Sequence, residues 1–318
     1  MKQMSVLPFS EVQSSDWDTF CTQAVNATFL HTRRFLSYHG SRFEDASVCV
    51  ICDDKMVGVM PAARYLSNSE IVCSHPGITY GGLIVTEWLT GARFLKALDT
   101  VAWHYADKGF SRLIYKVVPH IYHRRPAQED LYALQRMGAH RLRVDLAAVI
   151  DLADCGGLSS RRVRALKKSQ SAGIVVDANV ENLGSFWKVL EKNLTSSHNA
   201  SPVHSVEEMA LLMDRFPNNI SLRVAILEKD IVAGVVLFDS VRVRHCQYIG
   251  SSEIGRDKGA LDAIFNSSIR EASELGFRFF SFGISTEEEG KVLNEGLYTF
   301  KNEFGASGVV HEFYELTL

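Results

Sequence analysis

Long hydrophobic runs are missing from this 318-residue sequence. No stretch reaches the roughly 18 apolar residues that cross a bilayer, so we predict no membrane span. The opening Met1-Lys2-Gln3 does not lead into an apolar segment with a small-residue cleavage site. A signal peptide is therefore not indicated, and we expect a cytoplasmic protein.

Strong net charge and paired cysteines are also missing. The formal net charge is -3 at pH 7, so the composition gives no general attraction to nucleic acid or anionic lipid. The six cysteines are scattered. Cys49 and Cys52 form a CxxC, but it lies in an apolar run typical of a strand, where residues three apart face opposite sides. We therefore expect reduced thiols and no metal site.

What the sequence does contain is an internal repeat. Residues 53–61 and 228–237 each read as a turn followed by a buried strand with a central glycine, and a second strand is expected to end at Tyr80-Gly81-Gly82 and at Tyr248-Ile249-Gly250. An amphipathic helix follows in each half and ends at Gly109-Phe110 or Gly276-Phe277. A short strand comes next, at 113–118 and at 279–283. This order is common, so chance similarity is the alternative to a duplicated α/β domain.

The boundary between the two halves is expected at the polar, glycine-bearing segment 151–157. We predict domains at residues 1–150 and 151–318, since 318 residues exceed what one core usually supports. Ser159 or Ser160 is placed to cap a helix that runs to residue 172. This helix is rich in cations, and Arg161 and Arg164 fall roughly on one side. They are candidate phosphate ligands, with a solvated helix face as the alternative.

Two further segments have the character of binding loops. Residues 251–259 join a strand to a helix, where backbone N–H groups favour anions, so Arg256 and Gly259 are candidate phosphate contacts. Residues 74–82 contain glycines that permit a close approach to a ligand, and His75 and Tyr80 are candidate contacts. An ordinary solvated loop and a tight turn are the respective alternatives.

Three more segments hold groups suited to chemistry. A histidine side chain can exchange a proton near neutral pH, so His204 is a candidate general base, although loop histidines are usually inert. Residues 116–126 follow a strand of the first half and place His123 where α/β folds often bind ligands. Residues 285–289 carry three adjacent glutamates, which are either site groups or favourable charges at a helix start.

The second half resembles the Fem-type (FemAB-like) aminoacyltransferases, a branch of the GNAT acetyltransferase superfamily. The matching residues are Tyr248-Ile249-Gly250, Gly276-Phe277, Phe282-Gly283 and the motif Gly296-Leu297-x-x-Phe300-Lys301-x-x-Phe304-Gly305. The whole chain is similar to Fem-like GNAT proteins associated with polysaccharide biosynthesis, through 74–83, Pro202-Val203-His204 and 283–294. Acetyltransferases bind coenzyme A at an R/Q-x-x-G-x-G/A loop, which Arg256 and Gly259 match and Leu261 does not.

The resemblance implies an α/β (α+β) fold of two tandem GNAT-like domains, each a mixed, mostly antiparallel sheet flanked by helices. It implies transfer of an acyl group from coenzyme A thioester, or a similar activated donor, to an amine of an amino sugar or cell-envelope precursor. Lys301 would stabilise the oxyanion, and His204 or Glu287 would accept the proton. The residues expected to contact substrate are His75, Tyr80, His123, Tyr248, Ser285, Asn294 and Phe300.

Two alternatives remain from the sequence. One is an aminoacyl-tRNA-dependent transferase, which would need a larger basic face and shows no helical insert here. The other is a non-catalytic binding protein on a transferase fold, with a nucleotide-sugar as one possible ligand. No tightly bound cofactor is expected, and both a monomer and a homodimer fit the sequence.

Overall fold

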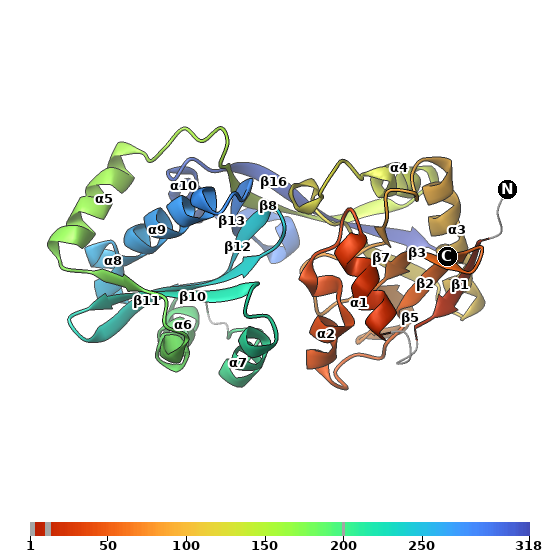
Figure 1. Ribbon diagram of the computed structural model, residues 1–318, viewed down its shortest axis with the longest axis horizontal. Coiled ribbons are helices and arrows are strands. Elements are labelled where there is room, and N and C mark those ends of the chain that lie inside the picture. Colours follow the sequence, from red (N-terminus) through yellow and green to blue (C-terminus); the bar gives the residue numbers. More distant parts are fainter. Residues whose placement is uncertain (1–3, 10–13, 199–200) are drawn as a thin grey trace. The chain divides into compact units, whose positions relative to one another are not determined.

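The computed structural model describes residues 4–9, 14–198 and 201–318 (Figure 1). The chain divides into two compact units. Unit 1 comprises Met1–Leu146, Glu287–Val292 and Val310–Leu318, and unit 2 comprises Ala147–Thr286 and Leu293–Val309. The change-over after Leu146 falls close to the predicted boundary at residues 150 and 151. The sequence offered no sign that two later segments belong to unit 1.

Unit 1 contains two sheets. One has the strand order β1-β2-β3-β6, from Met4–Pro8, Val48–Cys52, Lys55–Met60 and Ile84–Val85. The other has the order β4-β5-β7-β16-β8, from Ala63–Tyr65, Asn68–Cys73, Arg112–Lys116, Ser307–Thr317 and His140–Asp151. Its helices are α1 (Ser14–Gln23), α2 (Arg33–Leu36), α3 (Ala92–Asp107) and α4 (Glu129–Arg136). Helix α3 buries Phe94, Leu98, Val101 and Tyr105 in the core of the unit because they recur at helical spacing.

Unit 2 is built on one sheet with the order β8-β13-β12-β11-β10-β9. Its strands after β8 are β9 (Val175–Asp177), β10 (Ile220–Leu227), β11 (Asp230–Asp239), β12 (Val243–Ser251) and β13 (Phe279–Ile284). The helices are α5 (Ser160–Ser171), α6 (Leu183–His198), α7 (Val206–Arg215), α8 (Glu253–Lys258), α9 (Ala260–Glu274) and α10 (Glu295–Asn302). Figure 1 shows α6 and α7 on one face of this sheet and α5, α8 and α9 on the other.

The two units share a topology, but the hairpin of unit 1 is β4–β5, whereas the strand predicted within residues 53–61 is β3 and lies in the other sheet. In each, an antiparallel hairpin leads through a long helix to a strand that pairs in parallel, β5 with β7 in unit 1 and β12 with β13 in unit 2. A parallel pair needs such a crossover, whereas strand pairs such as β1–β2, β10–β11 and β7–β16 are antiparallel. The predicted cap is confirmed, since the Ser159 side chain accepts from the Arg162 N–H. The strand predicted to end at Tyr80-Gly82 is wrong, because these residues form a loop before β6.

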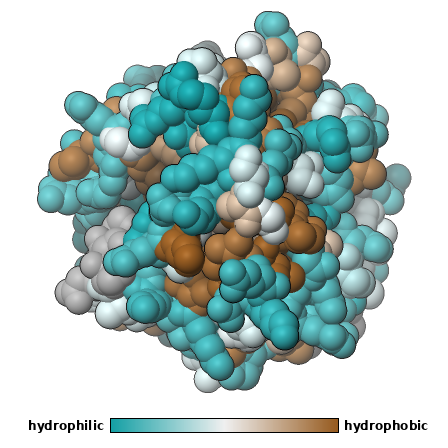
Figure 2. Space-filling view, turned by 90° about the vertical axis from the view of Figure 1, so that its left-hand side faces the viewer, coloured by the Kyte–Doolittle hydropathy of each residue, from teal (hydrophilic) through white to brown (hydrophobic). Residues whose placement is uncertain are grey.

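Apolar side chains also reach the surface of unit 2. Figure 2 shows hydrophobic residues gathered on the end face that carries α5 and α8. Val175 and Ile254 are 62% and 50% exposed. Exposed apolar residues are normal in globular proteins, so hydropathy alone does not locate a site here. In the described residues, no helix is long and apolar enough to cross a membrane.

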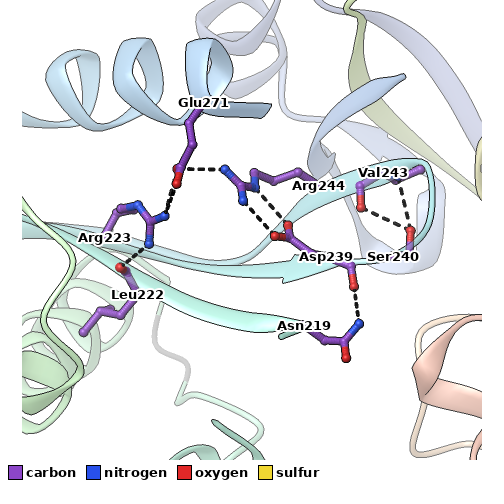
Figure 3. A network of polar contacts seen from close by, with 8 residues as sticks. All are labelled: Asn219, Leu222, Arg223, Asp239, Ser240, Val243, Arg244 and Glu271. Atoms are coloured by element: carbon purple, nitrogen blue, oxygen red, sulfur yellow. Dashed lines mark hydrogen bonds and ion pairs between the residues drawn. The ribbon is translucent and has the colours of Figure 1, made fainter. Parts of the chain in front are cut away.

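A buried ion network ties α9 to the sheet of unit 2 (Figure 3). Arg244 on β12 is 2% exposed and donates two hydrogen bonds to Asp239, from Nε to Oδ1 at 2.9 Å and from Nη2 to Oδ2 at 2.7 Å. Its Nη1 donates to Glu271 of α9 at 2.8 Å, and Arg223 on β10 donates to the same carboxylate. Each buried charge therefore has a partner of opposite sign.

Replacing Arg244 by methionine should strongly destabilise the protein. The Arg244→Met variant leaves the carboxylate of Asp239 without its bidentate partner, and breaking a buried pair costs about 3–5 kcal/mol. Urea unfolding measures the loss. Arg270→Met is the matched control, because Arg270 pairs with Glu274 on the exposed surface of α9. This substitution should lower the free energy of unfolding by no more than about 0.5 kcal/mol. Equal losses in the two variants would contradict the assignment.

Candidate functional site

Strands β12 and β13 separate part of the way along unit 2. Their parallel pairing covers Val243–His245 with Phe279–Ser281, and in the described structure it goes no further. Two irregularities accompany the separation. Gln247 is an extra residue in the pairing of β12 with β11, and Gly283 has a φ of 75° where the register of β13 with β8 shifts. Bulges of this kind re-aim backbone groups and are common beside active sites.

The buried ammonium of Lys301 sits at this separation. Lys301 comes from α10, is 3% exposed, and donates to Gly283 O at 3.1 Å, Ile284 O at 2.6 Å and Ser285 Oγ at 3.0 Å. Burial lowers the pKa of Lys301 to about 8. We name Cys246, Gln247, Gly283, Ile284, Ser285 and Lys301 the strand-end cluster. An ammonium group has three protons to donate, and the three acceptors around Lys301 account for all of them.

His204 and Tyr248 form a second pair of predicted residues that the fold brings together. The Nδ1 of His204 lies 2.6 Å from the Tyr248 hydroxyl, which also accepts from the His204 N–H at 3.2 Å. Tyr248 packs edge-on against Trp187 of α6, with ring centroids 5.1 Å apart. Burial raises the pKa of Tyr248 to about 12, so the phenol stays protonated at neutral pH. His204 is therefore a positioned imidazole, 8% exposed, and its role as a base stays a prediction.

The predicted anion loop at the start of α9 is filled from within unit 2. Gly259 has a φ of 70°, and a Cβ there would lie 2.7 Å from Ala165 O of α5. Asp262, in the first turn of α9 and 5% exposed, binds Arg162 of α5 at 3.0 Å. Arg256 donates to Ser251 O at 2.9 Å. Gly259 and Arg256 thus have internal contacts that account for them, and the first turn of α9 carries a carboxylate that is paired with Arg162 of α5.

The neighbouring predicted residues have local partners as well. Arg161 pairs with Glu303 at 3.5 Å, whereas Arg164 is exposed on α5. Phe300 packs against Phe265 and Phe304 beneath the guanidinium of Arg162, 4.8 Å from its ring centroid. Asn294 caps α10 by accepting from the Leu297 N–H. Phe300 and Asn294 therefore have structural roles that sequence reasoning did not assign.

The remaining predicted base, Glu287, falls in the other compact unit. It is exposed, lies in the two-residue strand β14 (Thr286–Glu287), and belongs to unit 1, whereas Lys301 and His204 belong to unit 2. Its role as a proton acceptor stays a prediction.

Unit 1 has a polar cavity of about 520 Å³ beside His75. His75 adopts a φ of 62°, which costs energy in a residue other than glycine, and stacks on His39 with ring centroids 5.0 Å apart. Burial lowers the pKa of His75 to about 3. The charged lining residues are Asp18, Arg33, Arg34 and Asp45. A cavity with charged walls, a strained histidine and a shifted pKa is the strongest candidate pocket of unit 1.

The glycines of the 74–82 loop serve packing. A Cβ on Gly81 would lie 2.0 Å from Ser74 O, and one on Gly82 would enter the ring of Tyr115. The Tyr115 hydroxyl accepts from the Leu83 N–H at 2.7 Å, and the loop carbonyls of His75 and Ile78 accept from the buried Lys116. These bonds hold the loop against β7. The glycines allow a close approach to other parts of the protein, whereas the sequence had suggested a close approach to a ligand.

Tyr80 and His123 belong to a buried aromatic cluster in unit 1. Tyr80 packs against Tyr122 at 4.4 Å, His31 at 5.7 Å and His311 at 6.4 Å between centroids. His123 is 2% exposed and bonds to Val118 O. Burial lowers the pKa values of His31 and His311 to about 4. Tyr80 and His123 are therefore buried core residues that carry polar atoms. The sequence had suggested instead that they contact a ligand.

This cluster predicts acid-sensitive folding. His31 and His311 remain neutral in the folded chain down to about pH 4, whereas in the unfolded chain they bind protons below about pH 6.5. The free energy of unfolding should therefore fall between pH 6.5 and pH 4, by about 1.4 kcal/mol per pH unit for each histidine. Urea titrations across this range measure the slope. His311→Gln should flatten it, and His120→Gln, at an exposed position, should not. Identical slopes in all three proteins would refute the explanation.

The comparisons with known proteins agree with this architecture. Residues 159–298 match the family model described as an acetyltransferase (GNAT) domain. No curated protein sequence matches the chain. Among solved structures, FemX superposes with a TM-score of 0.70 at 12% identity, covering 99% of this chain and 97% of FemX. L-PGS from Bacillus licheniformis gives 0.63 at 12% identity, covering 94% and 90%.

A tandem GNAT protein from the clavulanic acid biosynthesis pathway gives a TM-score of 0.54 at 8% identity, covering 99% of this chain and 98% of that one. At these identities the likeness concerns the fold, and the sequence match adds the family of the second half. Residues 159–298 thus match the acetyltransferase (GNAT) domain model in sequence, and the chain as a whole has the tandem GNAT fold.

Proposed function

We propose that this protein is an acyltransferase that moves an acyl group from an activated donor to an amine. The observation that carries the proposal is the strand-end cluster, in which the buried Lys301 ammonium bonds to the end of β13 where β13 has separated from β12. Both strands lie inside the GNAT-matching residues 159–298, and Lys301 follows just after them. Separated strands leave backbone groups for a ligand, and a positive charge in a dry site favours the negative charge of an acyl-transfer intermediate.

The reaction needs one C–N bond to form and the bond from the acyl carbon to its carrier to break. The acyl carbonyl lies at the ends of β12 and β13, the amine attacks it, and His204 accepts the proton that the amine loses. Tyr248, bonded to His204 Nδ1, orients the imidazole. Lys301 acts through its charge and by fixing the Gly283 and Ile284 carbonyls, because its three protons already have acceptors.

The donor is a coenzyme A thioester or an aminoacyl-tRNA. The carboxylate of Asp262 in the first turn of α9 and the close approach of α5 to Gly259 weigh against a pyrophosphate at the position that the R/Q-x-x-G-x-G/A loop implies. This specific observation favours the tRNA candidate as the second function. Transfer assays with acyl-CoA and with aminoacyl-tRNA, each with and without ribonuclease, separate the two. Activity with acyl-CoA that resists ribonuclease would reject the tRNA route.

For the acceptor, we propose an amine on an amino sugar or another cell-envelope precursor. The unit 1 cavity supports a polar acceptor, because both cations and carboxylates line it. A non-catalytic ligand-binding role on the same fold is the rival. Single-turnover assays with amino-sugar nucleotides decide between them, since tight binding without product would favour the rival.

Removing the Lys301 ammonium should abolish most turnover. Lys301→Met keeps the chain length but withdraws the charge and leaves three acceptors without their donor, so we expect kcat to fall about 10²–10³-fold. Stability should fall by about 1–3 kcal/mol, so assays are run well below the melting temperature. Lys291→Met, at an exposed lysine, is the control. Turnover within about threefold of the parent would remove Lys301 from the mechanism.

The same ammonium predicts an alkaline limit to activity. Because burial lowers the pKa of Lys301 to about 8, the charge is present below that pH and is lost above it. We expect kcat to fall about tenfold per pH unit above pH 8, measured in a pH–rate profile. An undiminished kcat at pH 10 would show that the charge is not required.

A further inference from the structure

His39 is a buried histidine whose two ring nitrogens both face carbonyl oxygens. It ends the single turn η3 (Ser37–His39), which follows α2, and it is 6% exposed. Its Nδ1 lies 2.9 Å from Leu36 O, and its Nε2 lies 3.0 Å from Gly77 O in the 74–82 loop. Because a carbonyl oxygen only accepts hydrogen bonds, each of these nitrogens must carry a proton for both bonds to exist. A neutral imidazole has one N–H, so this geometry requires the imidazolium form of His39.

Gly77 brings the loop into contact with this ring. A Cβ on Gly77 would lie 2.4 Å from His39 Nε2 and 2.6 Å from the ring of Phe43, which is closer than real Cβ contacts allow. A side chain at this position would therefore push the loop carbonyl away from His39. The glycine permits the bond that joins η3 to the loop.

His75 is the neutral member of a pair of neighbouring histidine rings. Its ring centroid lies 5.0 Å from that of His39. His75 Nδ1 accepts from the Gly77 N–H at 3.2 Å, so the one proton of the neutral ring is on Nε2. Burial, together with the neighbouring His39, lowers the pKa of His75 to about 3. Gly77 thus bonds to both rings, through its carbonyl to the charged ring and through its N–H to the neutral ring.

Other charged groups surround this pair. Arg42 donates to the His39 carbonyl, and the charged groups that share the described cavity lining with His39 are Asp18, Arg33, Arg34 and Asp45. Burial acts to raise the pKa of Asp45, but its ion pair with Arg33 lowers that pKa below the usual value. His75 and Asp45 therefore keep one charge state above pH 6, and arginine does not titrate in proteins. Burial raises the pKa of Asp18.

Lys116 approaches the same loop from β7. Its ammonium donates to the carbonyls of His75 and Ile78, and burial lowers the pKa of Lys116. A test of His39 must therefore separate its titration from those of Asp18 and Lys116.

We propose that His39 is a pH-dependent clamp on the wall of the unit 1 cavity. As an imidazolium it joins η3 to Gly77 and thereby holds His75 in the wall. When His39 loses a proton, one nitrogen faces a carbonyl without a hydrogen, and one of the two bonds is lost. The bond to Leu36 closes only a short stretch of chain and costs little entropy, so the bond to Gly77 is the one that breaks.

The direction of the pH effect follows from the charge. The folded geometry favours protonated His39, so the clamp is closed at the lower pH and opens as the pH rises through the titration of His39. This is the opposite direction to that of His31 and His311, which are neutral in the folded chain. The clamp is a property of the folded chain alone and stands whether or not the proposed acyl transfer does.

Solution NMR of the full chain tests the clamp, with isotope labels in the histidine rings and the glycine backbone. From pH 6 to pH 9, the ring ¹⁵N shifts of His39 should change from two protonated nitrogens to one. Solvent exchange of the Gly77 amide, corrected for base catalysis, should rise at least about fivefold with the same midpoint, because a buried hydrogen bond is lost. A single N–H on His39 at pH 6, or constant exchange of Gly77 across this range, would overturn the proposal. The measurement needs no variant, so it decides the question even where a substitution at His39 is unstable.

Two variants assign the step in Gly77 exchange to one residue. His39→Gln has no titratable group and should abolish the step. Asp18→Asn is the matched control from the same cavity, since it removes a titratable carboxylate but keeps an acceptor oxygen for the N–H groups of Arg33 and Arg34, and the step should remain. A step that persists in His39→Gln, or one that disappears in Asp18→Asn alone, would assign the effect to Lys116 or Asp18 and reject the clamp.

Discussion

The buried ammonium of Lys301 is the interaction on which the proposed site depends. One side chain of α10 holds two consecutive carbonyls of β13 and the hydroxyl of Ser285. Gly283 makes this possible, because its φ of 75° turns the chain out of the regular ladder. Without the cation, the carbonyls of a strand end that has left its partner would be buried without donors, at a cost comparable to several hydrogen bonds. The charge and the separated strands are thus parts of one arrangement.

This arrangement changes the role that the sequence suggested for Lys301. A side chain that donates a hydrogen bond to an oxyanion must have a proton to give, and all three protons of Lys301 already have acceptors in the protein. In the proposed reaction, its effect on a developing negative charge would therefore be electrostatic, through a buried cation. Backbone N–H groups are the donors that remain plausible on chemical grounds, since they line strands whose mutual pairing has ended.

The fold could be read from the sequence where the signal was local and periodic. The hairpins, the two long helices and their closing glycines recur in both halves, and helical spacing of residues such as Leu98 and Ile264 reports burial directly. The loop at Tyr80–Gly82 was misread as a strand end because apolar and aromatic residues there pack into a histidine-rich core. Composition gives no sign of which buried histidines stay neutral, because that depends on neighbours distant in sequence.

The site was harder to predict because residues of one type can be buried structural groups or exposed groups, and the sequence does not distinguish them. Arg162 belongs to the helix that the sequence showed to be rich in cations, yet unlike Arg161 and Arg164 it is buried, between Asp262 and the rings of Phe300 and Phe304. His204 and Tyr248 are 44 residues apart, and only the fold shows that they touch. Cys246 and Gln247 were not singled out, since a bulge is a property of pairing with β11 and leaves no mark in the strand itself.

The structure also bears on the incomplete match of residues 256–261 to the coenzyme A loop signature. Leu261 stands where a small residue would let backbone N–H groups approach phosphate, and one residue later Asp262 brings a carboxylate into the first turn of α9. A phosphate there would meet that carboxylate, and the desolvation that raises the pKa of Asp262 does not remove its ion pair with Arg162. Helix α5 packs so closely that a Cβ on Gly259 would lie 2.7 Å from Ala165 O, so a pyrophosphate at the start of α9 would lie near both α5 and the Arg162–Asp262 ion pair. A donor whose phosphates bind elsewhere avoids that proximity. Within the proposed function, the departure from the loop signature therefore fits a donor whose phosphates bind away from the start of α9.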